Sequence, residues 1–200
     1  TLQGDNISIV GTRSAADSRI SDTKRLAQNL GENGYTIVSG LARGIDAAAH
    51  TGALKADAPT LAILPGDVET IQPKSNTELA ADVRRNGALV SEISKFAPMH
   101  NGRYIERNRI TSGISDAVVI MASGETGGTV RQAELAEKQG KPRFLYDPAD
   151  GTGQSPNILQ NKGFVTFETK SELLQLLAKR KELFDVGKTK PSTLSEFCPQ

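Results

Sequence analysis

The fold of this chain is decided by residues 35–55, which read YTIVSGLARGIDAAAHTGALK. The apolar, β-branched run 35–38 is typical of a strand that is covered on both faces. Gly40 and Gly44 punctuate the turn that follows, and the alanine-rich segment 45–55 has the composition of a helix. This stretch therefore predicts one strand–turn–helix unit.

Strand-like and helix-like segments alternate over the rest of the chain. The expected strands are 6–10, 35–38, 60–64, 88–90, 117–121, 143–146 and 164–167. The expected helices are 18–33, 45–55, 75–85, 105–115, 130–139 and 171–182, with a helical turn at 157–161. Parallel strands need right-handed crossovers, so this alternation predicts an α/β fold with a doubly wound, mostly parallel sheet and helices on both faces. We expect one domain over residues 1–184 and a loose tail over 185–200.

Composition narrows the class of protein. The 200 residues carry a formal net charge of +1 and are 37% hydrophobic, which fits a folded domain. No apolar run approaches the roughly 18 residues of a membrane span and no secretory leader pattern is present, so we expect a cytoplasmic protein without a membrane segment. Cys198 is the single cysteine and no zinc spacing occurs, so we expect neither a disulfide nor a structural metal. A nearly neutral chain favours a local anion-binding groove over a basic coat for duplex DNA.

Turns rich in glycine and serine follow the expected strands. These turns are 11–13, 39–44, 65–66, 91–92 and 124–129. The carboxyl ends of parallel strands meet at one edge of a sheet, where such folds bind ligands, so we place the site there. Backbone N–H groups at a glycine-rich turn before a helix suit phosphate, although glycines are also found wherever a turn needs a positive φ. None of the turns carries a GxGxxG or Walker pattern, so no dinucleotide or NTPase motif is present.

Basic side chains fall in or near the same turns. They are Arg13, Arg43, Lys74, Arg103, Arg107 and Arg109. Arginine suits bidentate contacts to phosphate and stacking on bases, but any one of these could instead form a surface ion pair. Arg107 and Arg109 point to different faces of one helix, so one must approach the core. Arg109 could then hold a carboxylate such as Asp46 or Glu92.

Asp46 and His50 lie four residues apart on the expected helix 45–55. They could form an acid–base pair or part of a metal site, but no third ligand is apparent. We favour a hydrogen-bonded pair that fixes the preceding glycine turn. No catalytic arrangement of Ser, His and Asp or of Cys and His can be identified. Glu134, five residues after Thr129, could face the glycine-rich turn 124–129.

Several motifs occur in an order that resembles the DprA/Smf family of DNA-processing proteins. They are VGTR at 10–13, SGLARGIDAAAH at 39–50, SE at 91–92, RNRI at 107–110 and GISD at 113–116. The resemblance covers about residues 6–165. It implies an extended Rossmann-like fold for the domain 1–184 and binding of single-stranded DNA without catalysis or a cofactor. It also implies a homodimer that protects incoming strands and loads a RecA-type recombinase onto them during natural transformation.

The resemblance assigns the binding pocket in part. It implies a role for Arg13, for a basic residue before the RNR helix (Arg103 or His100), and for Tyr104 as a candidate base-stacking ring. The loop argument adds Lys74 and Arg107. The expected DNA-binding residues are Arg13, Ser39, Gly40, Arg43, Lys74, Arg103, Tyr104, Arg107, Arg109, Gly128 and Thr129.

One segment departs from the family pattern. Where the family commonly has an SGSL…TA turn, this chain has TGGTVRQ at 126–132. A Gly-Gly-Thr turn followed by Glu134 is similar to the LOG family of phosphoribohydrolases, which would give Glu134 and Arg107 or Arg109 catalytic roles on a nucleoside monophosphate. A nucleotide-sensing module is a further alternative. The turn 39–44 matches DprA/Smf instead, so we favour single-stranded DNA binding.

Overall fold

Seven strands form one parallel sheet. The strands are β1 (Asn6–Gly11), β2 (Thr36–Ser39), β3 (Thr60–Ile63), β4 (Ala88–Val90), β5 (Ala117–Ala122), β6 (Arg143–Tyr146) and β7 (Val165–Phe167). The computed structural model describes residues 5–98, 100, 102–149, 159 and 163–185. Within it the strand order is β4-β3-β2-β1-β5-β6-β7, and every neighbouring pair is parallel.

Strand order reverses between β1 and β5. Ile7 of β1 lies opposite Ile37 of β2 on one side and Ala117 of β5 on the other. The register between β1 and β5 shifts at Val10 and Gly11, where β1 ends. This reversal leaves a crevice beyond the carboxyl ends of the two strands, and it confirms the doubly wound α/β fold.

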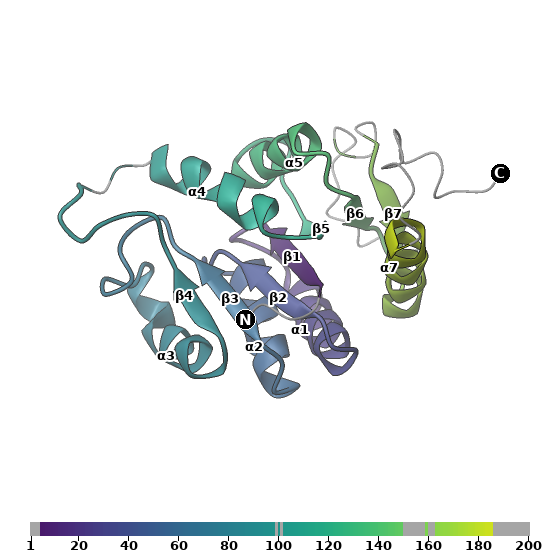
Figure 1. The fold of residues 1–200 in the computed structure, drawn as a ribbon, viewed down its shortest axis with the longest axis horizontal. Coiled ribbons are helices and arrows are strands. Elements are labelled where there is room, and N and C mark those ends of the chain that lie inside the picture. Colours follow the sequence, from purple (N-terminus) through teal and green to yellow (C-terminus); the bar gives the residue numbers. More distant parts are fainter. Residues whose placement is uncertain (1–4, 99, 101, 150–158, 160–162, 186–200) are drawn as a thin grey trace.

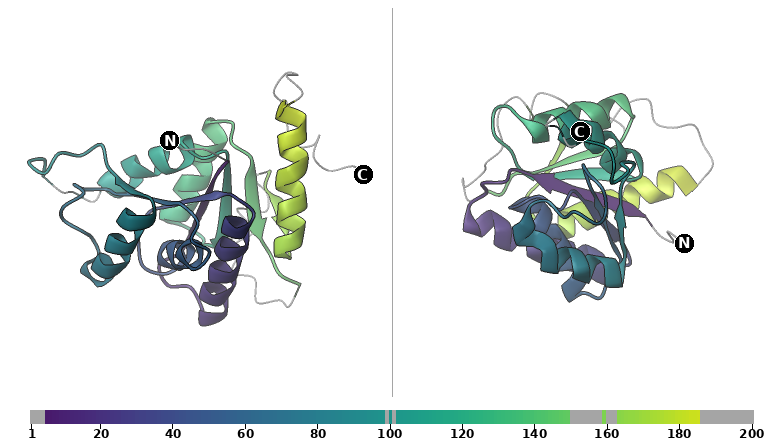
Figure 2. Two further views of the ribbon diagram at one scale, coloured as in Figure 1. Left: turned by 60° about the horizontal axis from the view of Figure 1, so that its bottom comes forward. Right: turned by 90° about the vertical axis from the view of Figure 1, so that its left-hand side faces the viewer.

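Helices cover both faces of the sheet. They are α1 (Asp17–Glu32), α2 (Ile45–Lys55), a short 3-10 helix η1 (Lys74–Asn76), α3 (Thr77–Asn86), α4 (Gly102–Gly113), α5 (Gly128–Lys138) and α7 (Lys170–Asp185). In Figure 1, α1, α2 and α3 lie on one side of the sheet, and α4 and α5 lie side by side on the other. Figure 2 shows the sheet between these two layers, with α7 beside its β7 edge.

The core explains why the strands are mostly apolar. Ile7 and Ile9 of β1 pack with Leu30 of α1, while Val10 belongs to the opposite face and packs with Val130 of α5. Successive strand residues point to opposite faces, so a sheet with two covered faces favours apolar residues at most positions, although a few buried strand positions here are polar.

Some boundaries differ from those expected. α4 begins at Gly102 rather than residue 105, because its first turn contains a glycine and two polar or charged residues that hide the helical period. α7 continues to Asp185, one residue past the expected end of the domain. Of the expected turn 157–161 and the expected tail 185–200, only Leu159 and Asp185 are among the described residues.

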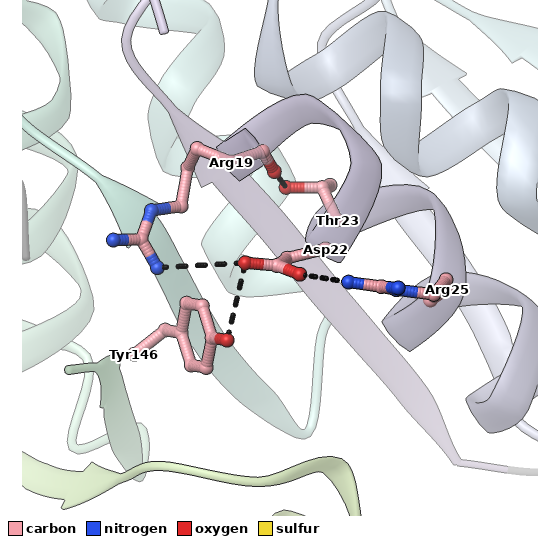
Figure 3. A network of polar contacts seen from close by, with 5 residues as sticks. All are labelled: Arg19, Asp22, Thr23, Arg25 and Tyr146. Atoms are coloured by element: carbon pink, nitrogen blue, oxygen red, sulfur yellow. Dashed lines mark hydrogen bonds and ion pairs between the residues drawn. The ribbon is translucent and has the colours of Figure 1, made fainter. Parts of the chain in front are cut away.

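A polar network attaches α1 to β6 (Figure 3). Arg19 is 1% exposed, and its guanidinium carbon lies 4.6 Å from the ring centre of Tyr146. The Tyr146 hydroxyl donates to Asp22 over 3.2 Å, and Arg25 donates to the other carboxylate oxygen of Asp22 over 2.5 Å. Thr23 donates to the Arg19 carbonyl over 2.7 Å.

Of the helices that the structure describes, none is long and apolar enough to cross a bilayer.

Candidate functional site

A cavity of about 480 Å³ opens beyond the carboxyl end of β1, at the reversal of strand order. It is enclosed by the turn after β1, by the start of α2, by α4 and by the N-terminus of α5. Its lining residues are Val10, Gly11, Thr12, Arg13, Ala42, Asp46, Tyr104, Ile105, Arg107, Asn108, Gly124, Thr126, Gly128, Thr129 and Gln132. This cavity therefore lies at the edge of the sheet where the site is expected.

Two glycines let the first two turns pack together. Gly44 has a φ of 77°, and a Cβ there would lie 2.5 Å from the carbonyl oxygen of Thr12. A Cβ at Gly11 would lie 2.6 Å from the side chain of Ile45. These two glycines are explained by backbone conformation and close approach, without any ligand.

The N-terminus of α5 is open. Gly127, with a φ of 113°, precedes the helix, and a Cβ on Gly128 would meet no atom of the described chain within 4 Å. Asn108 of α4 donates to the Gly128 carbonyl over 3.3 Å and holds this turn in place. The first N–H groups of an α-helix have no acceptor within the helix, and Gly128 and Thr129 line the cavity at the positive end of the helix dipole, as an anion site requires.

Arg13 and Tyr104 meet at the mouth of the cavity. Arg13 is exposed, Tyr104 is half-buried, and the guanidinium carbon lies 4.9 Å from the ring centre. This is a cation–π contact, and it brings together two expected site residues from distant parts of the chain. An exposed cation beside a ring can contact a phosphate and a base at the same time.

Arg107 is the arginine that enters the core. It is 7% exposed, and its guanidinium donates to the carbonyl of Ile63 at the end of β3. A Cβ on Gly40 would lie 2.0 Å from the Arg107 Nη1, so Gly40 provides the space for this side chain. Arg109 remains at the surface and forms an ion pair with Glu92, one of its two expected partners.

Asp46 and His50 do not form the expected hydrogen-bonded pair. Asp46 Oδ2 accepts from the Ala42 N–H over 3.3 Å, so Asp46 helps to fix the turn without His50. The His50 Nδ1 lies 2.8 Å from the Thr60 hydroxyl, which itself donates to the Ile37 carbonyl over 2.9 Å. Nδ1 must therefore carry the proton of the neutral imidazole.

Burial dominates the pKa of both groups. It raises the pKa of the Asp46 carboxyl, and the guanidinium of Arg107 and the Ala42 N–H oppose it in part. Burial and, secondly, the charge of Arg107 lower the pKa of His50 from 6.5 to about 3. The cavity wall thus combines a buried carboxyl with a buried guanidinium.

The structure places the other expected residues as follows. Gly128 and Thr129 line the cavity. Ser39 is buried and donates to the Ile9 carbonyl over 2.6 Å. Arg43 and Lys74 are exposed and lie outside the lining, and Arg103 is half-buried next to Tyr104. Their contribution to binding stays a prediction.

Gln132 and Asn108 also line the cavity, although the sequence did not predict them as site residues. Gln132 lies three residues after Thr129, so the two share a face of α5, and this spacing could have identified it. Glu134 lies two residues further on and is not among the lining residues. Within the described part of the chain, no group of three or more His, Cys, Asp or Glu could hold a metal ion.

Similarity to known proteins extends over most of the chain. The family model for DNA recombination-mediator protein A matches residues 1–177. Protein Smf of Escherichia coli is 32% identical over 179 residues, which are 88% of this chain and 48% of that protein. The DNA processing protein DprA of Bacillus subtilis is 32% identical over 154 residues, which are 74% of this chain and 52% of that protein. This chain spans about half the length of these two curated relatives.

Solved structures agree with these similarities. DNA processing protein A from Helicobacter pylori, described for its single-stranded DNA binding mode, superimposes with a TM-score of 0.80 at 29% identity. The match covers 88% of this chain and 81% of that chain.

Proposed function

The chain belongs to the DNA recombination-mediator protein A family, and on this premise we propose that it binds single-stranded DNA. The observation that carries the proposal is the contact between Arg13 and Tyr104 at the mouth of a cavity whose wall includes the open N-terminus of α5. Cation, ring and free N–H groups are the three elements of a sequence-tolerant site for a single strand.

Each element has a distinct task in the proposal. The N–H groups of Gly128 and Thr129 and the guanidinium of Arg13 bind backbone phosphates. The ring of Tyr104 stacks on a base, which requires a base that is not already paired in a duplex. Arg107 acts mainly through position, because its contact with the Ile63 carbonyl fixes α4 and therefore Tyr104. Single-stranded DNA is preferred to a duplex because the bases of a duplex are stacked and paired with one another and are not available to the Tyr104 ring.

The wider activity is proposed from the family. It consists of protecting incoming strands and loading a RecA-type recombinase onto them, as a cytoplasmic homodimer, in natural transformation. The chain acts by binding rather than by catalysis. The phosphoribohydrolase alternative needs Glu134 at the substrate, and the described lining of the cavity contains a different carboxylate, Asp46.

The test is a titration of a labelled single-stranded oligonucleotide, the matched duplex and AMP across a salt series. We expect the single strand to bind much more tightly than the duplex. Its affinity should fall as the salt concentration rises. Tight AMP binding without strand binding would contradict the proposal. Sedimentation at micromolar concentration tests the dimer, and the rate of recombinase assembly with and without the chain tests loading.

Arg13→Ala is the decisive variant. It removes the exposed cation and its surface contact with the Tyr104 ring but no buried side chain, so we expect at least a tenfold loss of strand affinity with thermal stability close to wild type. Arg85→Ala is the matched control, because Arg85 is exposed on α3 and its ion pair with Asp82 lies outside the cavity lining. Equal affinity of the two variants for the single strand would show that Arg13 does not contribute to binding.

A further inference from the structure

The cavity has two chemically different parts. Its rim consists of Arg13, Tyr104, Gly128 and Thr129, which are exposed or half-buried and suit phosphate and stacking. Its floor includes Asp46 and Gln132, which are 6% and 4% exposed. A phosphate satisfies the rim, whereas the floor sets the Asp46 carboxyl against the buried guanidinium of Arg107, so the floor can serve a polar, uncharged part of a ligand.

Gln132 has unused hydrogen-bonding capacity. Its side chain is buried in the wall of the cavity, and its Nε2 has no hydrogen-bond partner in the described chain. Buried amides are paired in nearly all folded proteins, so an unpaired one in a cavity wall indicates a ligand that would complete its bonding.

The Asp46 carboxylate has lone pairs left with which it can accept hydrogen bonds from a ligand. Its Oδ2 accepts from the Ala42 N–H, which leaves further lone pairs on a carboxylate that can accept about four hydrogen bonds. A carboxylate pairs best with two donors side by side. Among the four DNA bases, guanine alone presents two adjacent donors, N1–H and the N2 amino group, on its pairing edge, with the O6 acceptor beside them. Thymine, cytosine and adenine each place an acceptor next to their donor.

We propose that the cavity receives one unstacked guanine nucleotide, with its N1–H and N2 amino group on Asp46 and its O6 within reach of the Gln132 amide. The phosphate of that nucleotide then lies at the N-terminus of α5 beside Arg13. A cavity of about 480 Å³ is in the range that encloses small ligands. The inference rests on the proposed function where the guanine belongs to a DNA strand, and free dGMP carries the same chemistry.

The experiment compares thymidine oligonucleotides that differ at one central position. The position holds guanine, adenine, cytosine or thymine, and affinity is measured by fluorescence anisotropy at fixed salt. We expect the guanine strand to bind about tenfold more tightly than the thymine strand, as a good bidentate pair discriminates. A hypoxanthine at the same position lacks the N2 amino group and should lose most of this gain. A 7-deazaguanine keeps the pairing edge and should retain it.

Two variants test the floor. Gln132→Leu removes the amide without breaking a hydrogen bond of the described chain, so we expect unchanged thermal stability and a smaller preference for guanine. Asp46→Asn keeps an oxygen that can accept from the Ala42 N–H but loses one acceptor, so we expect the preference to disappear. If Asp46→Asn does not fold, Gln132→Leu and the hypoxanthine strand decide the question. A preference that survives in Gln132→Leu and with hypoxanthine overturns the inference.

The outcomes separate this inference from the proposed function. Equal binding of all four strands overturns the guanine assignment and leaves single-strand binding intact. Binding of dGMP without binding of any strand supports the guanine pocket and overturns the strand proposal. Binding of neither overturns both. Arg85→Ala serves again as the control for general effects of charge.

Discussion

Arg107 and Arg109 show how two nearby residues on one helix take different roles. Successive helical residues are rotated by about 100°, so residues two apart point to nearly opposite sides. Arg107 is buried against the Ile63 carbonyl, and Arg109 pairs with Glu92 at the surface. The spacing predicts that one arginine approaches the core. Which of the two arginines enters the core depends on Gly40, which lies in the turn after β2 and leaves space for the Arg107 guanidinium.

Gly40→Ala should therefore destabilise the protein. The added methyl group would fall 2.0 Å from Nη1 and 2.4 Å from Cζ of Arg107, and the guanidinium cannot move away without losing its bond to Ile63. We expect the free energy of unfolding to fall by about 1–3 kcal/mol in urea titrations, as for other overpacked sites. Gly128→Ala is the control, because its Cβ meets open space. Equal stability of the two variants would contradict this account of Gly40.

His50 makes stability depend on pH. Burial keeps its pKa near 3 in the folded chain, whereas the unfolded chain takes up a proton near 6.5. The stability that depends on a neutral His50 imidazole is fully present above pH 6.5 and is lost as the pH falls from 6.5 towards 3. Below pH 6.5 the free energy of unfolding should decrease by up to about 1.4 kcal/mol per pH unit.

The variant His50→Asn isolates this contribution. Its amide nitrogen can replace Nδ1 as the donor to Thr60, but it does not titrate. Urea unfolding between pH 7 and 5 should show a shallower pH dependence than wild type. This window lies above the ordinary range of most carboxyl groups. Parallel pH profiles for the two proteins would exclude His50 as the source.

At the scale of elements, the sequence predicts the strands better than the site. All seven expected strands are present within one or two residues, because a strand covered on both faces is apolar at most positions. The convergence of the turns follows from parallel topology alone. The contact between Arg13 and Tyr104 depends on how α4 packs across the sheet, which no local pattern contains.

The attachment of α1 to β6 gives a prediction that is independent of the cavity. Tyr146→Phe keeps the ring under Arg19 and removes the hydrogen bond to Asp22 (Figure 3). We expect a loss of about 0.5–1.5 kcal/mol in the free energy of unfolding and unchanged affinity for a single strand. Tyr146→Ala also removes the ring and should cost more. A loss of strand affinity in Tyr146→Phe would show that this network influences the cavity.

At the scale of the whole molecule, topology and charge act together. The reversal of strand order opens one crevice, and the near-zero net charge of +1 means that attraction for an anion must come from groups beside that crevice. Arg13 and the N-terminus of α5 provide this attraction at the rim, while Arg107 lies in the wall. The molecule is therefore suited to a few localised phosphate contacts.

The salt dependence of strand binding follows from this arrangement. For a single strand, the logarithm of affinity falls with the logarithm of salt concentration with a slope of about −0.7 for each neutralised phosphate. Two or three contacts at the rim predict a slope of about −1.4 to −2.1, and Arg13→Ala should bring it closer to zero by about 0.7. Anisotropy titrations at four or more salt concentrations measure both slopes. A slope of −5 or steeper in wild type would require basic residues outside the cavity, with Arg43 and Lys74 as the first to replace. A shallow slope that Arg13→Ala leaves unchanged would mean that the α5 N-terminus alone binds the phosphate.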